Sequence, residues 1–139
     1  MKKLFTPKYG HPYGDQTYFG ELHHKKYIPH GKGKLVSDNG EKYVGDFKNA
    51  QFYGKGKYTL SNGEKYNGQW KNNKKHGWGL YWWPDNSKYA GQWRNDKRTG
   101  RGIYTWPDGR MYHGQHKNNK MHGKGILTKT SGLNIVGEW

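Results

Sequence analysis

The feature that most constrains this chain is a short phrase that returns at a fixed interval. Tyr66-Asn67-Gly68-Gln69-Trp70 recurs as Tyr89-Ala90-Gly91-Gln92-Trp93 and in weaker copies on either side. A fixed period this short indicates an array of repeats, in which each unit buries its apolar residues against its neighbours. The central glycines of the copies lie 23 residues apart, at Gly45, Gly68, Gly91, Gly114 and Gly137.

A second column of paired glycines follows the same period. Gly-x-Gly begins at Gly31, Gly54, Gly77, Gly100 and Gly123. The first phrase glycine, Gly20, precedes Gly45 by 25 residues, so the first period is longer by two. The excess lies between Leu22 and Gly31, where we expect a longer loop.

Each repeat reads as one β-hairpin. Residues 54–60 and 64–70 alternate in the manner of strands, and Ser61-Asn62-Gly63 separates them. This is the chemistry of a three-residue loop, a type I turn followed by a residue with positive φ. Glycine takes that last place four times, and Asn86 takes it once.

The loop length also fixes which residues face each other. Tyr58 is expected opposite Tyr66 and Gly56 opposite Gly68, so that bare glycines leave a channel across which neighbouring rings lie. The fold predicted is all-β, an elongated single-layer antiparallel meander of hairpin repeats forming a twisted ribbon with a groove. The candidate aromatic groove consists of Tyr43, Phe47, Tyr66, Trp70, Tyr89, Trp93 and Tyr112.

Composition supports a repeat protein with an anionic partner. Hydrophobic residues make up only 30% of the 139 residues, but aromatic residues make up 17%, so rings must supply most of the burial. The net charge of +15 points to nucleic acid, acidic lipid or an acidic protein, and solubility alone is the other explanation. Cysteine is absent, which excludes disulfides and thiolate sites.

We expect a flexible or capping arm over residues 1–14 and a repeat array over 15–139, with about five hairpins and a terminal half. We also expect a cytoplasmic location, with or without attachment to membranes or the cytoskeleton.

The face opposite the rings changes character along the chain. Early positions such as Lys34 and Lys57 are cationic, whereas later ones are apolar. Either the later repeats fold over themselves, or the later face is a self-association patch. The candidate patch consists of Trp78, Leu80, Trp82, Ile103, Met111, Ile126 and Val136.

The segments between hairpins carry two ladders of cations at the same period. Their spacing suits a polyanion or a sheet of anionic headgroups, and like charges about one Debye length apart are also tolerable without a partner. The candidate contacts are Lys48, Lys71, Arg94 and Lys117 in one ladder and Lys74, Lys97 and Lys120 in the other.

The sequence offers no arrangement for catalysis. Its serines lie in or beside turns, and the Gly-Lys-Gly-Lys stretches lack the strand-to-helix step of a phosphate-binding loop. His23, His24 and His30 form either a metal site or an exposed loop, and we favour the loop. We therefore predict a protein that is not an enzyme and has no catalytic residues, cofactor or metal.

The combination of Gly-x-Gly, Asp/Asn-Gly, Tyr-x-Gly-x-Trp and His-Gly at period 23 closely resembles the MORN (membrane occupation and recognition nexus) repeat family over residues 15–139. The His-Gly step is present at His30, His76 and His122 and departs to Tyr53 and Thr99. The cationic connectors are richer in charge than the family's usual pattern. The resemblance implies a non-catalytic interaction and assembly module, often dimeric, in a family to which phospholipid binding has been attributed.

Three functions follow from these observations. The leading one is a protein-interaction scaffold that forms a homodimer through its C-terminal half and presents an aromatic groove to a protein partner. The second is an adaptor that binds anionic phospholipid membranes through the connector ladders. The third is nucleic-acid binding by a basic, aromatic-rich surface.

Overall fold

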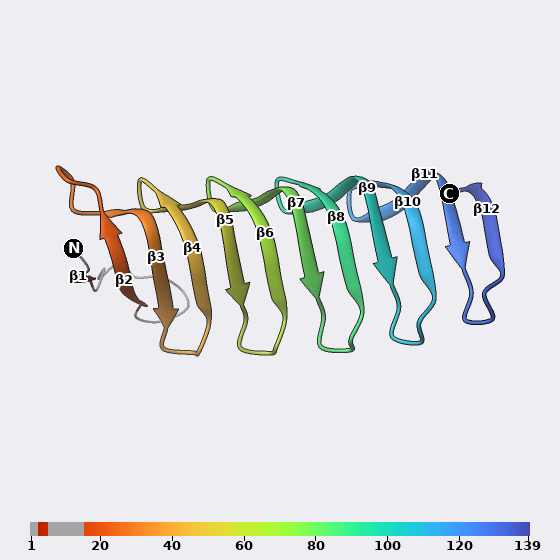
Figure 1. The fold of residues 1–139 in the computed structure, drawn as a ribbon, viewed down its shortest axis with the longest axis horizontal. Coiled ribbons are helices and arrows are strands. Elements are labelled where there is room, and N and C mark those ends of the chain that lie inside the picture. The colour runs from red at the N-terminus through yellow and green to blue at the C-terminus, as the bar shows by residue number, and fades with distance from the viewer. Residues whose placement is uncertain (1–2, 6–15) are drawn as a thin grey trace.

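The computed structural model describes residues 3–5 and 16–139 and shows one antiparallel sheet of twelve strands whose order follows the chain (Figure 1). The predicted all-β, single-layer meander is confirmed. The strands are β1 (Lys3–Phe5), β2 (Gln16–Leu22), β3 (Pro29–Ser37), β4 (Lys42–Lys48), β5 (Gln51–Thr59), β6 (Lys65–Lys71), β7 (Lys74–Trp82), β8 (Lys88–Arg94), β9 (Lys97–Thr105), β10 (Met111–Lys117), β11 (Lys120–Thr128) and β12 (Asn134–Glu138).

The three-residue turns form as predicted along one edge of the sheet. The last turn residue has positive φ in all five hairpins, from 71° at Asn86 to 94° at Gly63 and Gly109. The Asn or Asp before it accepts a hydrogen bond from the N–H two residues later, as Asn62 Oδ1 does from Glu64 N at 2.9 Å. The turn is therefore specified by one conformational and one hydrogen-bonding requirement.

The connectors at the other edge are hairpins too, which the sequence analysis did not foresee. Asn72 and Asn73 both have positive φ, at 50° and 67°, and Lys71 pairs directly with Lys74. This is a two-residue type I′ turn, whose twist matches that of the flanking strands. The strands β5, β7, β9 and β11 consequently begin three residues earlier than predicted.

A row of glycines crosses the sheet and forms the floor of the aromatic core. The predicted pairs Gly56–Gly68 and Tyr58–Tyr66 are confirmed. A Cβ on Gly79 would lie 2.2 Å from the hydroxyl of Tyr66, because that ring lies flat over the glycine. The row consists of Gly20, Gly33, Gly45, Gly56, Gly68, Gly79, Gly91, Gly102, Gly114, Gly125 and Gly137. We call the face that holds the rings the ring face and the other the open face.

The tyrosines that open the repeated phrase all make the same hydrogen bond. Each hydroxyl donates to the carbonyl three residues later, for example from Tyr66 to Gln69 O at 2.7 Å and from Tyr89 to Gln92 O at 2.9 Å. Tyr18, Tyr43 and Tyr112 repeat this contact. The tyrosine column thereby supplies both the packing and its own polar satisfaction.

The first repeat has the longer loop that the two extra residues predicted. Leu22 pairs with Pro29, and residues 23–28 close the loop, with Tyr27 N bonded to His23 O at 2.9 Å. Of the expected N-terminal arm, Lys3–Phe5 adds strand β1 beside β2, and the rest lies outside the described residues.

The interpretation in which the later repeats fold over themselves is wrong. Every described strand pairs only with its neighbours in the chain, and the array runs on in one direction (Figure 1). On the open face, Trp78 and Val136 remain 57% and 78% exposed.

Gly79→Ala tests the glycine floor. The added methyl group meets the Tyr66 ring, so we expect the free energy of unfolding to fall by about 3 kcal/mol or more. Gly63→Ala is the matched control, since open space surrounds Gly63 and only its φ of 94° opposes a side chain. It should cost about 1 kcal/mol, and equal losses in chemical denaturation would contradict the ring contact as the cause.

Candidate functional site

The three predicted sets of residues occupy three separate places. The aromatic set lies on the ring face, the cation ladders lie at the edge formed by the two-residue turns, and the apolar set lies on the open face.

The seven rings predicted to line a groove are the core of the array. Their exposed fractions run from 0% at Tyr89 and Tyr112 to 8% at Trp70. The indoles are also satisfied internally, as Trp70 Nε1 donates to Gly56 O at 3.0 Å. The rings that remain partly exposed on this face, and so are open to a partner, belong to a neighbouring set: Phe52, Tyr58, Trp83, Tyr104 and Trp106.

One position on the ring face differs in chemistry in every repeat. It is occupied by Phe52, Lys75, Arg98 and Met121, each 23 residues after the last. Phe52 stacks on Tyr43 at 3.8 Å between ring centroids, and Lys75 lies over the rings of Tyr81 and Trp93 at 5.1 and 5.0 Å. Aromatic rings lie beneath this position in repeat after repeat, whereas the side chain that lies over them varies. The sequence analysis missed this position because it assigned these residues to connectors.

His116 is an irregularity within the core itself. It takes the place of Trp70 and Trp93, is 4% exposed, and lies edge-on to Tyr89 and Tyr112 at 4.9 and 5.2 Å. Both ring nitrogens are buried without a hydrogen-bond partner. Burial and the nearby charge of Arg98 lower the pKa of His116 to about 4. This imidazole is therefore neutral at pH 7.

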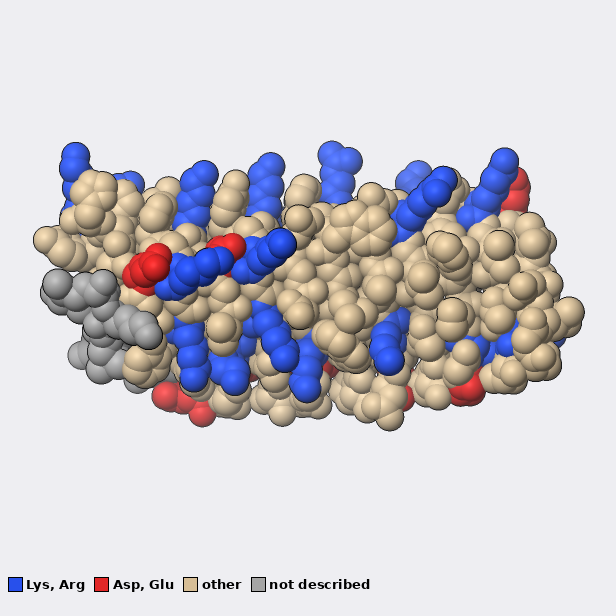
Figure 2. Space-filling view, viewed as in Figure 1, with Lys and Arg blue, Asp and Glu red and all other residues tan. Residues whose placement is uncertain are grey.

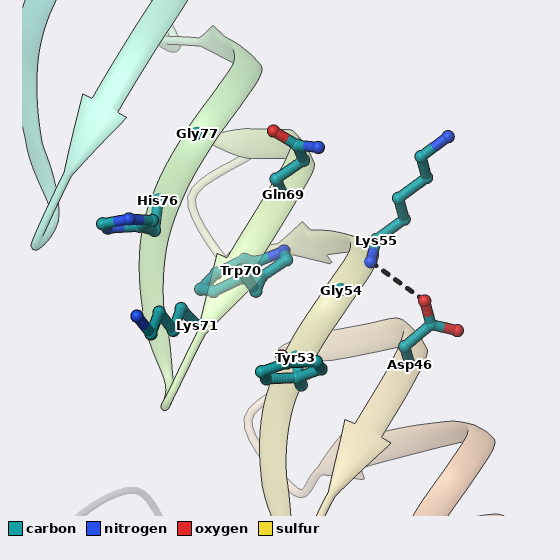
Figure 3. Close-up of a pocket in the computed structure, with 9 residues that line it drawn as sticks. All are labelled: Asp46, Tyr53, Gly54, Lys55, Gln69, Trp70, Lys71, His76 and Gly77. Carbon is teal, nitrogen blue, oxygen red and sulfur yellow. Dashed lines mark hydrogen bonds between the residues drawn. The ribbon is translucent and has the colours of Figure 1, made fainter.

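Shallow clefts on the open face mark the boundary of each repeat, and Figure 3 shows one of them. Here Asp46 Oδ2 accepts from Lys55 N at 3.0 Å, and one repeat later Gln69 Oε1 accepts from Trp78 N at 2.8 Å. The N–H that each acceptor binds lies in a β-bulge. The bulge forms because the glycine just before this N–H has a positive φ, which is 64° at Gly54 and 88° at Gly77. These two side-chain acceptors are thus used by the fold.

The hydrogen bond from Lys55 N also affects the pKa of Asp46. Burial acts to raise it, but hydrogen bonds from the Lys32 ammonium and Lys55 N outweigh burial, and the pKa is lowered. Lys32 also forms an ion pair with this carboxylate.

The ladder cations flank two-residue turns, and these turns are hydrogen-bonded to the preceding repeats. Asn73 Oδ1 accepts from Phe52 N, Asp96 Oδ1 from Lys75 N and Asn119 Oδ1 from Arg98 N, at 2.8 to 2.9 Å. Each turn is thereby fixed to the preceding repeat, so the cations beside it stand in register. All seven ladder residues are exposed, and Figure 2 shows basic side chains projecting along this edge.

The open face carries a row of apolar side chains in its second half, with one histidine, His113, among them. Register places Leu80, Ala90, Ile103, His113, Ile126 and Val136 side by side across β7–β12. Trp78, Trp82 and Met111 flank this row on the same face, as do the cations Lys88, Arg101 and Lys124. The predicted patch is therefore one surface in the structure.

Rings and cations are largely segregated between the two faces. Stacking of nucleic-acid bases needs aromatic rings beside a basic groove. The ladder cations, however, lie at the edge formed by the two-residue turns, whereas the rings lie on the ring face. Among the described residues, Lys75 and Arg98 lie over Trp93 and Trp83, and Arg110 and Lys48 lie over Trp106 and Tyr53.

The histidine-rich loop is organised by its own backbone. His23 Nδ1 accepts from Lys25 N and Lys26 N at 3.2 Å, and its ring contacts those of His24 and His30. Over the described ranges, no group of three or more ligating side chains is arranged to hold a metal ion. Within the same ranges, no helix has the length and apolarity needed to cross a bilayer.

Comparison with known families gives one result that spans most of the chain. The model described as MORN repeat matches residues 18–42, 43–65, 66–88, 89–109 and 112–133. Each matched range covers two strands joined by a two-residue turn, or by the longer loop in the first repeat, and runs into the three-residue turn that follows. Comparison with curated proteins gives no significant match.

His116 predicts a specific loss of stability in acid. Its pKa is about 4 in the folded chain and has the ordinary value of 6.5 when unfolded, so the unfolded state takes up the proton first. The free energy of unfolding should fall by about 3 kcal/mol between pH 6.5 and 4 through this group alone.

His116→Trp restores the residue of the neighbouring repeats and should remove that part of the pH dependence. The control is His113→Gln on the exposed open face, which should keep it. Denaturant titrations at several pH values measure both, and a wild-type slope in His116→Trp would refute the assignment.

Proposed function

The chain belongs to the MORN repeat family, and we propose that it is a non-catalytic scaffold that self-associates through the open face of its C-terminal half and binds a protein partner on its ring face. The observation that carries the first part of the proposal is the apolar row on β7–β12. A soluble protein exposes an apolar surface of this kind mainly where another molecule covers it.

The two halves of the open face differ in a way that supports the proposal. In the first half, exposed Phe19 and Val44 alternate along the row with Lys34 and Lys57. In the second half no lysine interrupts the row, which runs from Leu80 to Val136. Two copies of the cationic half repel each other, whereas two copies of the apolar half bury surface.

A two-fold contact between copies suits this patch, because the same residues then meet from both sides. Such a dimer leaves both ring faces uncovered. The partly exposed rings of Phe52, Trp83 and Trp106 then remain available to a protein partner. The scaffold would thus hold two partner-binding faces in one assembly.

Ile126→Lys with Val136→Lys tests the self-association. Two cations per copy placed at the C-terminal end of the apolar row should shift the equilibrium toward monomer by about a hundredfold or more. Sedimentation velocity over a concentration series measures the change.

Val44→Lys is the matched control, because Val44 is 45% exposed in the same row of the sheet but in the cationic half. This variant should associate as the unaltered chain does. A concentration-independent monomer for the unaltered chain would overturn the proposal.

A second candidate function has its own supporting observation. The seven ladder cations stand at one edge, on turns clamped at regular intervals, and carry no ion pair among the residues of 16–139. Each cation near an acidic bilayer contributes about 1 kcal/mol. The turn edge would then bind anionic phospholipid headgroups while both faces remain free for proteins.

Charge reversal at the ladder tests membrane binding. Changing Lys71, Lys74, Lys97 and Lys120 to Glu should weaken binding to vesicles containing phosphatidylserine by about a hundredfold or more at physiological salt. Reversing four open-face lysines changes the net charge equally and serves as the control: Lys34, Lys57, Lys65 and Lys88. Equal losses in vesicle flotation would show that net charge, rather than the turn edge, is responsible.

A further inference from the structure

Lys75 and Arg98 lie at equivalent positions over the rings of two neighbouring repeats, but only Lys75 has carboxylates nearby. Lys75 Nζ lies 3.9 Å from Asp96 Oδ1. Burial lowers the pKa of Lys75, while Asp96 and Glu64 act to raise it. The chain therefore supplies two carboxylates to this partly buried ammonium.

Arg98 occupies the same position one repeat later and has neither acid. The residues 23 positions after Asp96 and Glu64 are Asn119 and Ser87. Across residues 16–139, no acidic side chain forms an ion pair with Arg98. Burial lowers the pKa of its guanidinium. A partly buried cation without a counterion is destabilising unless something outside the chain supplies the negative charge.

The guanidinium is nevertheless held in one place. It lies over the rings of Trp83, Tyr89 and Tyr104 at 5.4, 5.7 and 5.4 Å, and Nη2 donates to Asn119 O at 2.6 Å. Stacking and this hydrogen bond orient the planar group and leave further N–H donors of its fork available. Arg98 is therefore ordered before any ligand arrives.

The space beside Arg98 is a cleft of about 410 Å³ between the last repeats. His116 lines this cleft with both ring nitrogens unpartnered, although the residue is 4% exposed. The walls are the rings of Tyr104, Trp106 and Trp139, and the side chains of Asn119, Lys120 and Met121 complete the lining.

We propose that this cleft binds a carboxylate attached to an apolar group, with Arg98 as the donor to its oxygens. A planar carboxylate matches the remaining donors of the guanidinium fork, and its single charge balances that of Arg98. The three rings accept the apolar body of the ligand. This site lies on the ring face and is independent of self-association on the open face.

Titration with 3-phenylpropionate tests the site on the full chain. The indole N–H signals of Trp106 and Trp139 and the guanidinium N–H signals of Arg98 should shift in NMR spectra. The neutral amide 3-phenylpropanamide should bind at least about tenfold more weakly, because it forfeits the charged hydrogen bonds. Equal affinity for acid and amide, tighter binding of inorganic phosphate, or no binding of the acid would each overturn the proposal.

Asn119→Asp is the most specific variant. It restores the acid found at Asp96, whose φ of 67° is close to the 69° of Asn119, so the turn is expected to be kept. The new carboxylate should compete with the ligand and weaken binding at least about tenfold. Arg98→Met, which introduces the residue found at Met121, should abolish binding.

Lys75→Met is the matched control and should leave 3-phenylpropionate binding unchanged, since the charge of Lys75 is already paired. Undiminished binding in Arg98→Met or Asn119→Asp, or loss in Lys75→Met, would refute the site. The source of the carboxylate is resolved by comparing acetyl-glycyl-phenylalanine with acetyl-glutamyl-phenylalaninamide. Tighter binding of the first supports a chain terminus as the ligand, and tighter binding of the second supports an acidic side chain.

Discussion

The whole array depends on a tyrosine ring lying flat on a row of glycines. The close approach is possible only because no Cβ stands in the way, and the hydroxyl then reaches a carbonyl of the bulge, as Tyr43 does with Asp46 O at 2.7 Å. The bulge in turn needs the positive φ of a second glycine and an acceptor that satisfies its N–H. Ring, glycine floor and bulge therefore form one cooperative unit that each repeat must reproduce.

This unit explains which parts of the fold the sequence predicted. Glycines at a fixed period and Asn-Gly or Asp-Gly turns are local signals with a direct conformational meaning, so the hairpins, their register and the opposed glycines all followed. The type I′ turns did not, because Asn49-Ala50 and Asn95-Asp96 lack the glycine that usually marks them. Their conformation depends on contacts with the neighbouring repeat, such as that of Asp96 Oδ1 with Lys75 N.

The candidate sites were harder to predict than the fold for a related reason. Periodicity identified Tyr66 and Trp70 as important, but a residue that every repeat needs is a residue that the core uses. Function in a repeat array resides in positions where the scaffold tolerates change. The position of Phe52, Lys75, Arg98 and Met121 could be recognised only once the structure showed that it lies on the ring face.

His116 connects the weakest point of the core with the cleft beside it. An imidazole is smaller than the indole found at Trp93, and it forgoes the hydrogen bond that this indole makes to Gly79 O. The same replacement sets an imidazole in the wall of the cleft beside an unpaired guanidinium, with both ring nitrogens buried. A ligand that neutralised this guanidinium would stabilise the last repeats, so binding at this cleft and stability of the last repeats would be thermodynamically linked.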